Sequence, residues 1–137
     1  MKYACLVYHE EQKLLSTSDD DLARAVKGCG DWIEKLNQSH SHIFSSGLQA
    51  VRSGATVRRR NGALSVTDGP FVETKEFLAG FTIIEARDLN EAINLVSNFP
   101  ASEIGSVEIR PLLEPGQELS DPVDAKILRA LTLSGNL

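Results

Sequence analysis

Cysteine is scarce in this sequence, and its scarcity excludes two kinds of protein. Cys5 and Cys29 are the only two among 137 residues, too few for the disulfide framework of a small secreted domain. No Cys-x-x-Cys or His-Glu-x-x-His pattern occurs, so no metal motif is visible, and we expect neither a metal nor another cofactor. Hydrophobic residues make up 42% and charged residues 24%, which indicates one soluble globular domain.

Long apolar runs and an excess of positive charge are lacking as well. The opening segment, residues 2–8, is apolar, but His9, Glu10 and Glu11 end it at once. It is too short for a signal peptide or for the ~20 residues of a membrane span. We therefore expect a cytoplasmic protein with no membrane partner. Acidic residues outnumber basic ones by 19 to 14, which disfavours nucleic acid as a partner.

The remaining signals alternate between strand and helix. Ser18 followed by three aspartates, and Asp88 followed by Glu91, are capping patterns, so we expect a helix to begin at each place. Residues 10–18 indicate a loop, and Pro100 is expected to end the second helix. Four apolar segments are typical of strands: residues 2–8, 42–50, 78–86 and 105–112.

A β-hairpin is the clearest local prediction. Asn61-Gly62 is the favoured two-residue connection of a type I′ turn. The basic run at residues 58–60 lies beside it, and strand alternation sends its side chains to both faces, so solvated charges are the favoured interpretation. Pairing across the turn places four side chains on one face: Val57, Arg59, Leu64 and Val66.

The order β-α-β, hairpin, β-α-β predicts a ferredoxin-like α+β fold for residues 1–113, with both helices on one face of an antiparallel sheet. Residues 2–8 and 78–86 are apolar at odd and even positions alike, so both faces of the sheet need cover. A second copy is the simplest cover, which predicts a homodimeric α+β barrel with an inserted hairpin and a cavity between subunits. Residues 114–137 form a tail with a short helical pattern at 124–133.

Gly28-Cys29-Gly30 interrupts the first predicted helix. Each glycine costs about 1 kcal/mol there relative to alanine. Close packing of the helix is the favoured explanation, and close approach of a ligand or a partner backbone is the alternative. Cys29 lies on the apolar side of the helix, so we expect an inert, buried thiol rather than a reactive thiolate.

The densest polar run is Thr67–Glu76. Turn chemistry alone explains Asp68 and Gly69, and would leave the charged side chains solvated. As a site, Asp68 would act as a general base or orient a ligand hydroxyl. Lys75 and Arg110 would hold an anion, although a cross-strand carboxylate is an equal alternative partner for Arg110. The candidates are Asp68 as catalytic residue, with Gly69, Pro70, Phe71, Lys75 and Arg110 binding the ligand.

Histidine adds one ligand-binding candidate. His9 follows the first strand, where cleft residues often lie, although a lone loop histidine is more often simply solvated. His40 and His42 are two apart and would share one face of a strand. With no third ligand nearby, we expect no metal there.

The polar run also resembles a family signature. Its Thr67–Phe71 and Glu73–Glu76 segments, together with Gly80-Phe81, are similar to the signature of DGPF-domain proteins in the YCII-related superfamily. The resemblance covers residues 1–113. It implies a ferredoxin-like dimeric α+β barrel with an active-site cleft near the Asp68 loop. It implies much less about activity, because most members have no assigned reaction.

Departures from the family pattern keep two functions open. Some relatives carry a His–Asp pair suspected of acid–base work, and one branch removes chloride from a hydroxylated aromatic ring. This chain has Gly28–Asp31 where many relatives place that histidine, so the pair is incomplete. One interpretation is that the protein, with or without enzyme activity, binds a small polar or anionic molecule near Asp68. The other is a non-catalytic regulatory or binding module, which the resemblance links to sigma factors.

Overall fold

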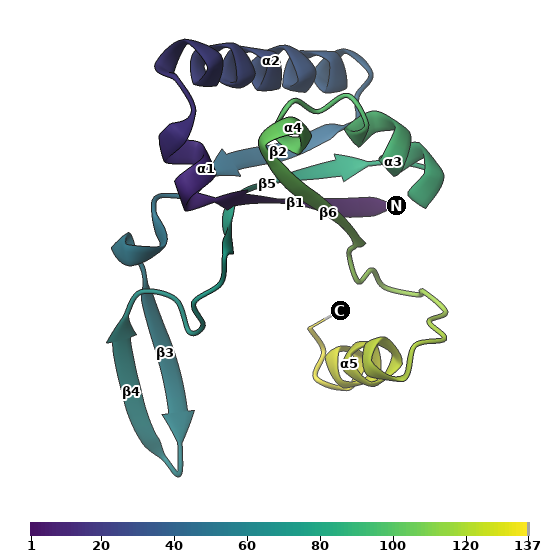
Figure 1. The fold of residues 1–137 in the computed structure, drawn as a ribbon. Helices are drawn as coiled ribbons and strands as arrows, with labels where there is room; N and C mark the ends of the chain where they lie inside the picture. Colours follow the sequence, from purple (N-terminus) through teal and green to yellow (C-terminus); the bar gives the residue numbers. More distant parts are fainter. Residues whose placement is uncertain (137) are drawn as a thin grey trace.

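The computed structural model describes residues 1–136 and is built around one four-stranded antiparallel sheet (Figure 1). The strand order is β2-β5-β1-β6, so the first and last strands of the sheet lie side by side. This is the ferredoxin-like arrangement, and the predicted fold class is confirmed. The strands are β1 (Lys2–Glu10), β2 (His42–Gly47), β5 (Glu76–Glu85) and β6 (Gly105–Pro111).

Two helices, α2 (Asp19–Gln38) and α3 (Leu89–Val96), lie on one face of this sheet (Figure 1). Both begin at the predicted caps. The Ser18 hydroxyl accepts a hydrogen bond from the Asp21 amide at 3.1 Å, and the Asp88 carboxylate accepts one from the Glu91 amide at 2.9 Å. Each cap satisfies a backbone donor that the first helical turn leaves without a partner.

The hydrophobic core fills the space between the sheet and these helices. Trp32 of α2 stacks on Phe99 with ring centroids 4.1 Å apart, and its indole N–H donates to the Leu95 carbonyl at 2.7 Å. The indole is thus buried with its one polar group satisfied. The other buried apolar residues are Tyr3, Cys5, Val7, Leu36, Ile84, Ala86, Ala92, Val96 and Ala101.

Gly28 packs closely against the loop that follows α3. A Cβ atom at Gly28 would lie 2.9 Å from Cγ of Pro100, whereas one at Gly30 would meet nothing within 4 Å. The packing explanation therefore holds for Gly28 and not for Gly30. A glycine without a neighbour has only the helix-propensity cost.

A β-bulge interrupts the pairing of β5 with β1. The register passes from Gly80 directly to Leu78, and Ala79 has no partner in β1. Because side chains alternate along a strand, one extra residue reverses which positions face which side. Glu76 consequently lies on the same sheet face as Phe81.

The predicted hairpin forms as a separate two-stranded sheet of β3 (Ala55–Arg60) and β4 (Ala63–Asp68). Its register pairs Val57 with Val66 and Arg59 with Leu64, as predicted. Asn61 and Gly62 have φ of 50° and 77°, the left-handed values that a type I′ turn requires. The hairpin extends beyond the end of the four-stranded sheet, on the side opposite α2 and α3 (Figure 1).

Three predicted boundaries were wrong. Residues 10–18 are not a loop, since β1 runs to Glu10 and a short helix α1 (Glu11–Ser16) follows. Pro100 does not end the second helix, which already stops at Val96; it is the N-cap of the short helix α4 (Ala101–Ile104). The second strand is shorter than expected and is followed by the 3-10 turn η1 (Val51–Ser53).

The tail holds the expected helix. It is α5 (Pro122–Leu133), which starts two residues before the predicted range and is capped by the Asp121 carboxylate. The division of the chain into residues 1–113 and a tail from 114 stays a prediction. No helix within residues 1–136 is long and apolar enough to cross a membrane.

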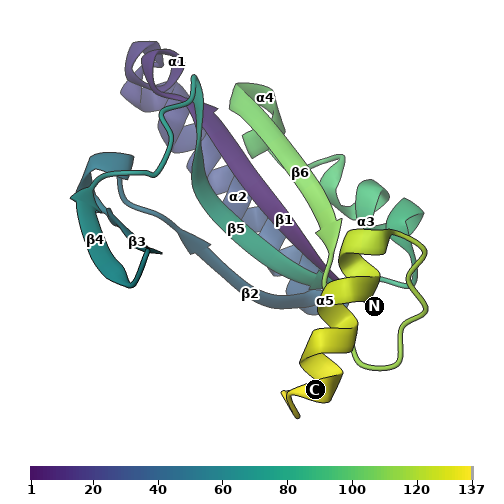
Figure 2. The same ribbon diagram turned by 90° about the horizontal axis from the view of Figure 1, so that it is seen from below.

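The sheet surface opposite the helices is open. Figure 2 views it from this side, with the strands in front of α2, α5 at one end and the hairpin at the other. Phe44 and Phe81 lie here with ring centroids 5.9 Å apart, and Phe44 is 54% exposed. We call this surface the open face; its apolar part is formed by Ala4, Leu6, Tyr8, Phe44, Leu78, Phe81 and Ile83.

Candidate functional site

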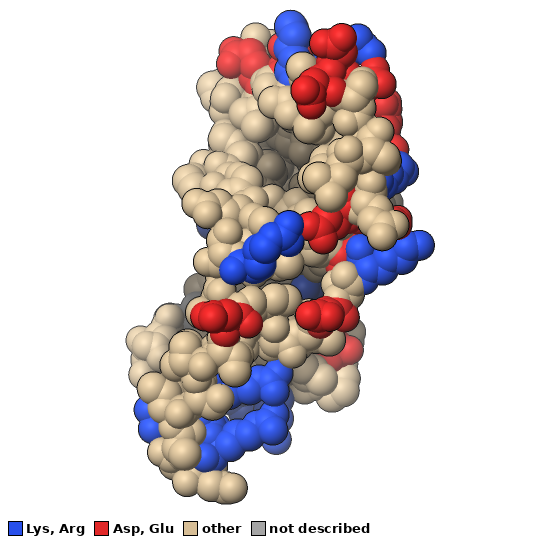
Figure 3. All heavy atoms as spheres, turned by 60° about the vertical axis from the view of Figure 1, so that its left-hand side comes forward, with Lys and Arg blue, Asp and Glu red and all other residues tan. Residues whose placement is uncertain are grey.

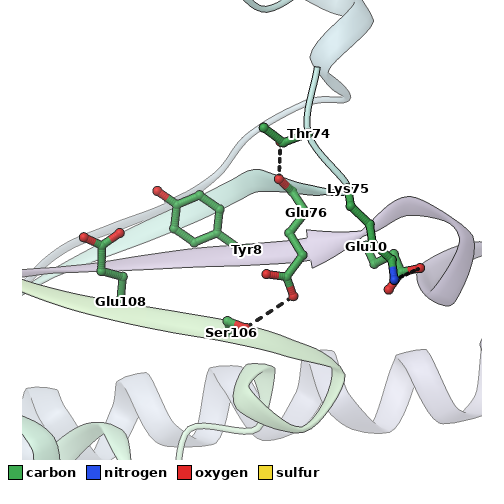
Figure 4. Close-up of a pocket in the computed structure, with 7 residues that line it drawn as sticks. All are labelled: Tyr8, Glu10, Thr74, Lys75, Glu76, Ser106 and Glu108. Carbon is green, nitrogen blue, oxygen red and sulfur yellow. Dashed lines mark hydrogen bonds and ion pairs between the residues drawn. The ribbon is translucent and has the colours of Figure 1, made fainter. Parts of the chain in front are cut away.

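A shallow, open cavity of about 640 Å³, lined by polar residues, lies on the open face, where β1, β6 and the start of β5 meet (Figure 4). Its volume falls within the ~300–1,000 Å³ of small-molecule sites. Seven residues line it: Tyr8, Glu10, Thr74, Lys75, Glu76, Ser106 and Glu108.

Strand alternation and register bring these residues together. Tyr8 and Glu10 occupy alternate positions of β1, and Ser106, which pairs directly with Tyr8, precedes Glu108 by two residues in β6. Glu76 pairs with Glu10, beyond the bulge in β5. Because paired residues share a sheet face, all five side chains project to the open side.

Hydrogen bonds and an ion pair order the polar groups. The Glu76 carboxylate accepts from the Ser106 hydroxyl at 3.3 Å, and the Thr74 hydroxyl donates to the Glu76 backbone carbonyl (Figure 4). Lys75 Nζ lies 3.7 Å from a Glu10 carboxylate oxygen. Lys75 is largely exposed, so this pair contributes little to stability.

The cavity carries more negative than positive charge. Three carboxylates line it against one ammonium group, which already faces Glu10. The hydroxyls of Tyr8, Thr74 and Ser106 both donate and accept hydrogen bonds. This arrangement suits a ligand that offers hydroxyl or ammonium donors better than an anionic one.

Of the predicted site residues, only Lys75 lines this cavity. Arg110 lies beside it: its Nε is 2.8 Å from an oxygen of Glu108, two residues away in β6. The carboxylate partner expected for Arg110 thus exists, within its own strand rather than across two strands. Lys75 and Arg110 therefore lie near the same site, because each is paired with a carboxylate that lines the cavity.

Asp68, Gly69 and Pro70 lie at the base of the hairpin, outside the cavity lining. Gly69 has φ of 82°, and its amide donates to the Gly54 carbonyl at 2.8 Å. Its carbonyl accepts from the Thr56 hydroxyl at 2.7 Å. These bonds support the turn interpretation of the segment.

Of the two phenylalanines of the signature, one is on the surface and the other, Phe81, is half-buried. Phe71 is 70% exposed, and the Arg58 guanidinium lies 5.8 Å from its ring centroid. Phe81 belongs to the open face, where it lies beside Phe44. Neither ring walls the cavity within one chain.

His9 occupies the sheet face that the helices cover. It pairs with Gly105 between the cavity positions of β1, so alternation turns it away from the cavity. Within residues 1–136 its Nδ1 is buried without a hydrogen-bond partner. Burial lowers the pKa of His9, while the backbone of Ile104 and the charge of Glu76 act in the opposite direction.

Neither cysteine is poised as a nucleophile. Burial raises the pKa of Cys5 to about 11, and it also raises the pKa of Cys29, against a smaller opposing effect of the Ala101 backbone. A raised pKa lowers the thiolate fraction, which supports an inert Cys29, although its side chain is half-buried rather than buried as predicted. Within the described residues, no three His, Cys, Asp or Glu side chains gather as metal ligands.

The chain is similar to known proteins along most of its length. Residues 1–115 match the model of the YCII-related domain. An uncharacterised protein of Rhizobium meliloti (strain 1021) is 31% identical over 121 residues, which cover 85% of this chain and 98% of the relative.

Among solved structures, a similar one is 5-chloro-2-hydroxyhydroquinone dehydrochlorinase from Burkholderia phenoliruptrix AC1100 in complex with 2,5-dihydroxybenzoquinone. The TM-score is 0.49 at 14% sequence identity, and the match covers 83% of this chain and 95% of the other. A similarity of this size carries no information about activity.

Proposed function

The chain belongs to the YCII-related family, and we propose that it binds a small polar molecule in the cavity on the open face. One observation carries the proposal: seven polar side chains from three segments converge on a hollow of about 640 Å³ beside the apolar part of the open face. A concave site that combines apolar surface with a few convergent polar groups is typical of small-molecule binding sites.

The ligand we propose is rich in hydroxyl or ammonium groups. Glu76 and Glu108 present carboxylate oxygens to the hollow, and Tyr8 adds its hydroxyl and its aromatic ring. Donor groups of a ligand would satisfy these acceptors, and an apolar ring would pack on Tyr8 and the adjoining open face. The anionic ligand considered from Lys75 and Arg110 is disfavoured, because both cations already face carboxylates.

We also propose that the working unit is a homodimer that buries the open face. Phe44, Phe81 and Ile83 are partly exposed there, and no element of the described chain covers the middle of this face. An apolar sheet face of this kind favours a protein partner. A second copy would also close the cavity, which is shallow and open to solvent in one chain.

Binding is tested by titration calorimetry with a panel of matched small molecules that carry hydroxyl, ammonium or carboxylate groups on the same ring. Glu76→Gln and Glu108→Gln should weaken binding of the preferred member by at least about tenfold, because each removes a charged acceptor. Glu103→Gln makes the same change on α4, away from the cavity, and should leave binding unchanged.

The same titration decides the role of Asp68, which stays a prediction. If Asp68→Ala abolishes binding while Glu76→Gln and Glu108→Gln do not, the ligand is held at the hairpin base and the cavity proposal is wrong. Product analysis after incubation with the bound molecule shows whether binding leads to turnover.

A further inference from the structure

The β3–β4 hairpin, which we call the arm (residues 55–68), exposes an apolar surface. Val57, Leu64 and Val66 are 63%, 57% and 61% exposed. The register places all three on one face of the arm. A two-stranded sheet with three exposed branched side chains is marginal by itself in water, so such a face favours a partner.

The arm is also basic in an acidic chain. Its three consecutive arginines contrast with a net charge of −5 for the whole sequence, and Lys and Arg side chains gather over this end of the molecule (Figure 3). Arg58 is turned toward its own Phe71. Arg59 shares the apolar face, donates only to the Gly62 carbonyl at 3.1 Å, and has no carboxylate partner within the described residues.

The position of the arm limits what can cover the open face. It extends on the open side of the sheet (Figure 1). Each of its strands has six residues, which corresponds to a length of roughly 20 Å. Two sheets packed face to face lie only ~10 Å apart. A second copy seated on the open face would therefore lie alongside the arm over much of its length.

The open face is complementary to the arm in both respects. Its centre is apolar, with Leu6, Phe81 and Ile83 only partly buried. Its cavity end carries the carboxylates of Glu76 and Glu108. An apolar surface bordered by negative charge fits an apolar arm whose Arg59 guanidinium has no carboxylate partner within the described residues.

We infer that the arm of each copy packs its Val57–Leu64–Val66 face on the open face of a second copy and brings Arg59 to the acidic cavity there. The inference rests on the homodimer proposed above. In a twofold-symmetric dimer the two arms exchange reciprocally, so each cavity receives one guanidinium from the other chain. Arg59 then adds a cation to a cavity in which three carboxylates face one ammonium group, and its guanidinium can form two parallel hydrogen bonds to a carboxylate.

Sedimentation equilibrium with two matched pairs of variants tests this inference. Arg59→Glu and Arg60→Glu are identical changes at neighbouring positions on opposite faces of the arm. Val66→Lys and Ser65→Lys introduce the same residue at another such pair of positions. We expect Arg59→Glu and Val66→Lys to raise the dimer dissociation constant at least about tenfold. Arg60→Glu and Ser65→Lys should change it less than about threefold.

Two results would overturn it, and they differ from one another. If the wild-type chain stays monomeric over a 100-fold range of protein concentration, both the proposed dimer and the arm contact are wrong. A wild-type dimer that all four variants leave intact would keep the dimer and remove the arm from its interface. The urea midpoint of each variant is measured in parallel, and if Val66→Lys is unfolded, the Arg59 and Arg60 pair decides.

Discussion

The two faces of the one sheet differ in how their apolar residues are used. Along β1, Tyr3, Cys5 and Val7 lie beneath the helices and are at most 7% exposed. The residues between them, Ala4 and Leu6, face the open side and are only partly buried. The covered face stabilises the single chain, while the open face has apolar area that only another molecule can bury. A strand that is apolar at successive positions thus serves two separate purposes.

The sharpest contrast comes from truncating the covered side. Trp32→Ala removes the ring stacked on Phe99 and leaves the Leu95 carbonyl without its donor. We expect a loss of about 3–5 kcal/mol in the free energy of unfolding, measured by urea denaturation. A loss below 1 kcal/mol would show that the covered face is not the stabilising one.

A charge on the open face should act on association instead. Phe81→Lys places an ammonium group among Leu6, Phe44 and Ile83. We expect the dimer dissociation constant to rise at least about tenfold. The free energy of unfolding of the monomer should fall by about 1 kcal/mol or less. Leu15→Lys changes a leucine that is 77% exposed on α1 and is the control. Equal oligomeric state for both variants would contradict the distinction between the faces.

A smaller effect distinguishes the two glycines of α2, on the outer layer of the covered side. Gly28→Ala must displace the Pro100 ring, so we expect a loss of about 1 kcal/mol or more. Gly30→Ala meets open space and should gain up to about 1 kcal/mol from helix propensity. Urea midpoints that shift in the same direction for both would rule out the contact of Gly28 with Pro100.

The smallest expected effect is a pH dependence from His9. Burial lowers its pKa in the folded chain, so the unfolded chain binds a proton more readily below the ordinary value of about 6.5. The free energy of unfolding should therefore fall as pH decreases from 7 to 5, and it should fall less steeply in the His9→Gln variant. Unfolding free energies at both pH values test this, with His40→Gln as the control. Identical slopes for wild type and His9→Gln would exclude a contribution from His9.

Local signals predicted the elements well where backbone chemistry is specific. The Asn61-Gly62 turn fixed the register of the arm residue by residue, because few dipeptides favour two left-handed positions. Ser18 and Asp88 marked helix starts because their side chains can accept from a free amide two or three residues on. The short helix α1 was missed since Leu14 and Leu15 form no periodic apolar face.

The candidate cavity could be predicted only in part. Lys75 was identified from a charged run in a turn, but Tyr8 and Ser106 are nearly 100 residues apart and meet only through strand pairing. Their alternate positions in β1 and β6 were visible in the sequence. What the sequence did not provide was the register that sets Tyr8 opposite Ser106, since many residues in these strands have similar pairing energies.

The bulge at Ala79 makes the chemistry of the cavity depend on how β5 pairs with β1. If Ala79 paired with Tyr8 in a regular ladder, every residue before it in β5 would turn to the other face, and the Glu76 side chain would lie on the side that the helices cover. A carboxylate would leave the cavity without any residue being replaced. A shift of one residue in this pairing would keep the same sheet and the same sequence, yet present a different set of charges to a ligand.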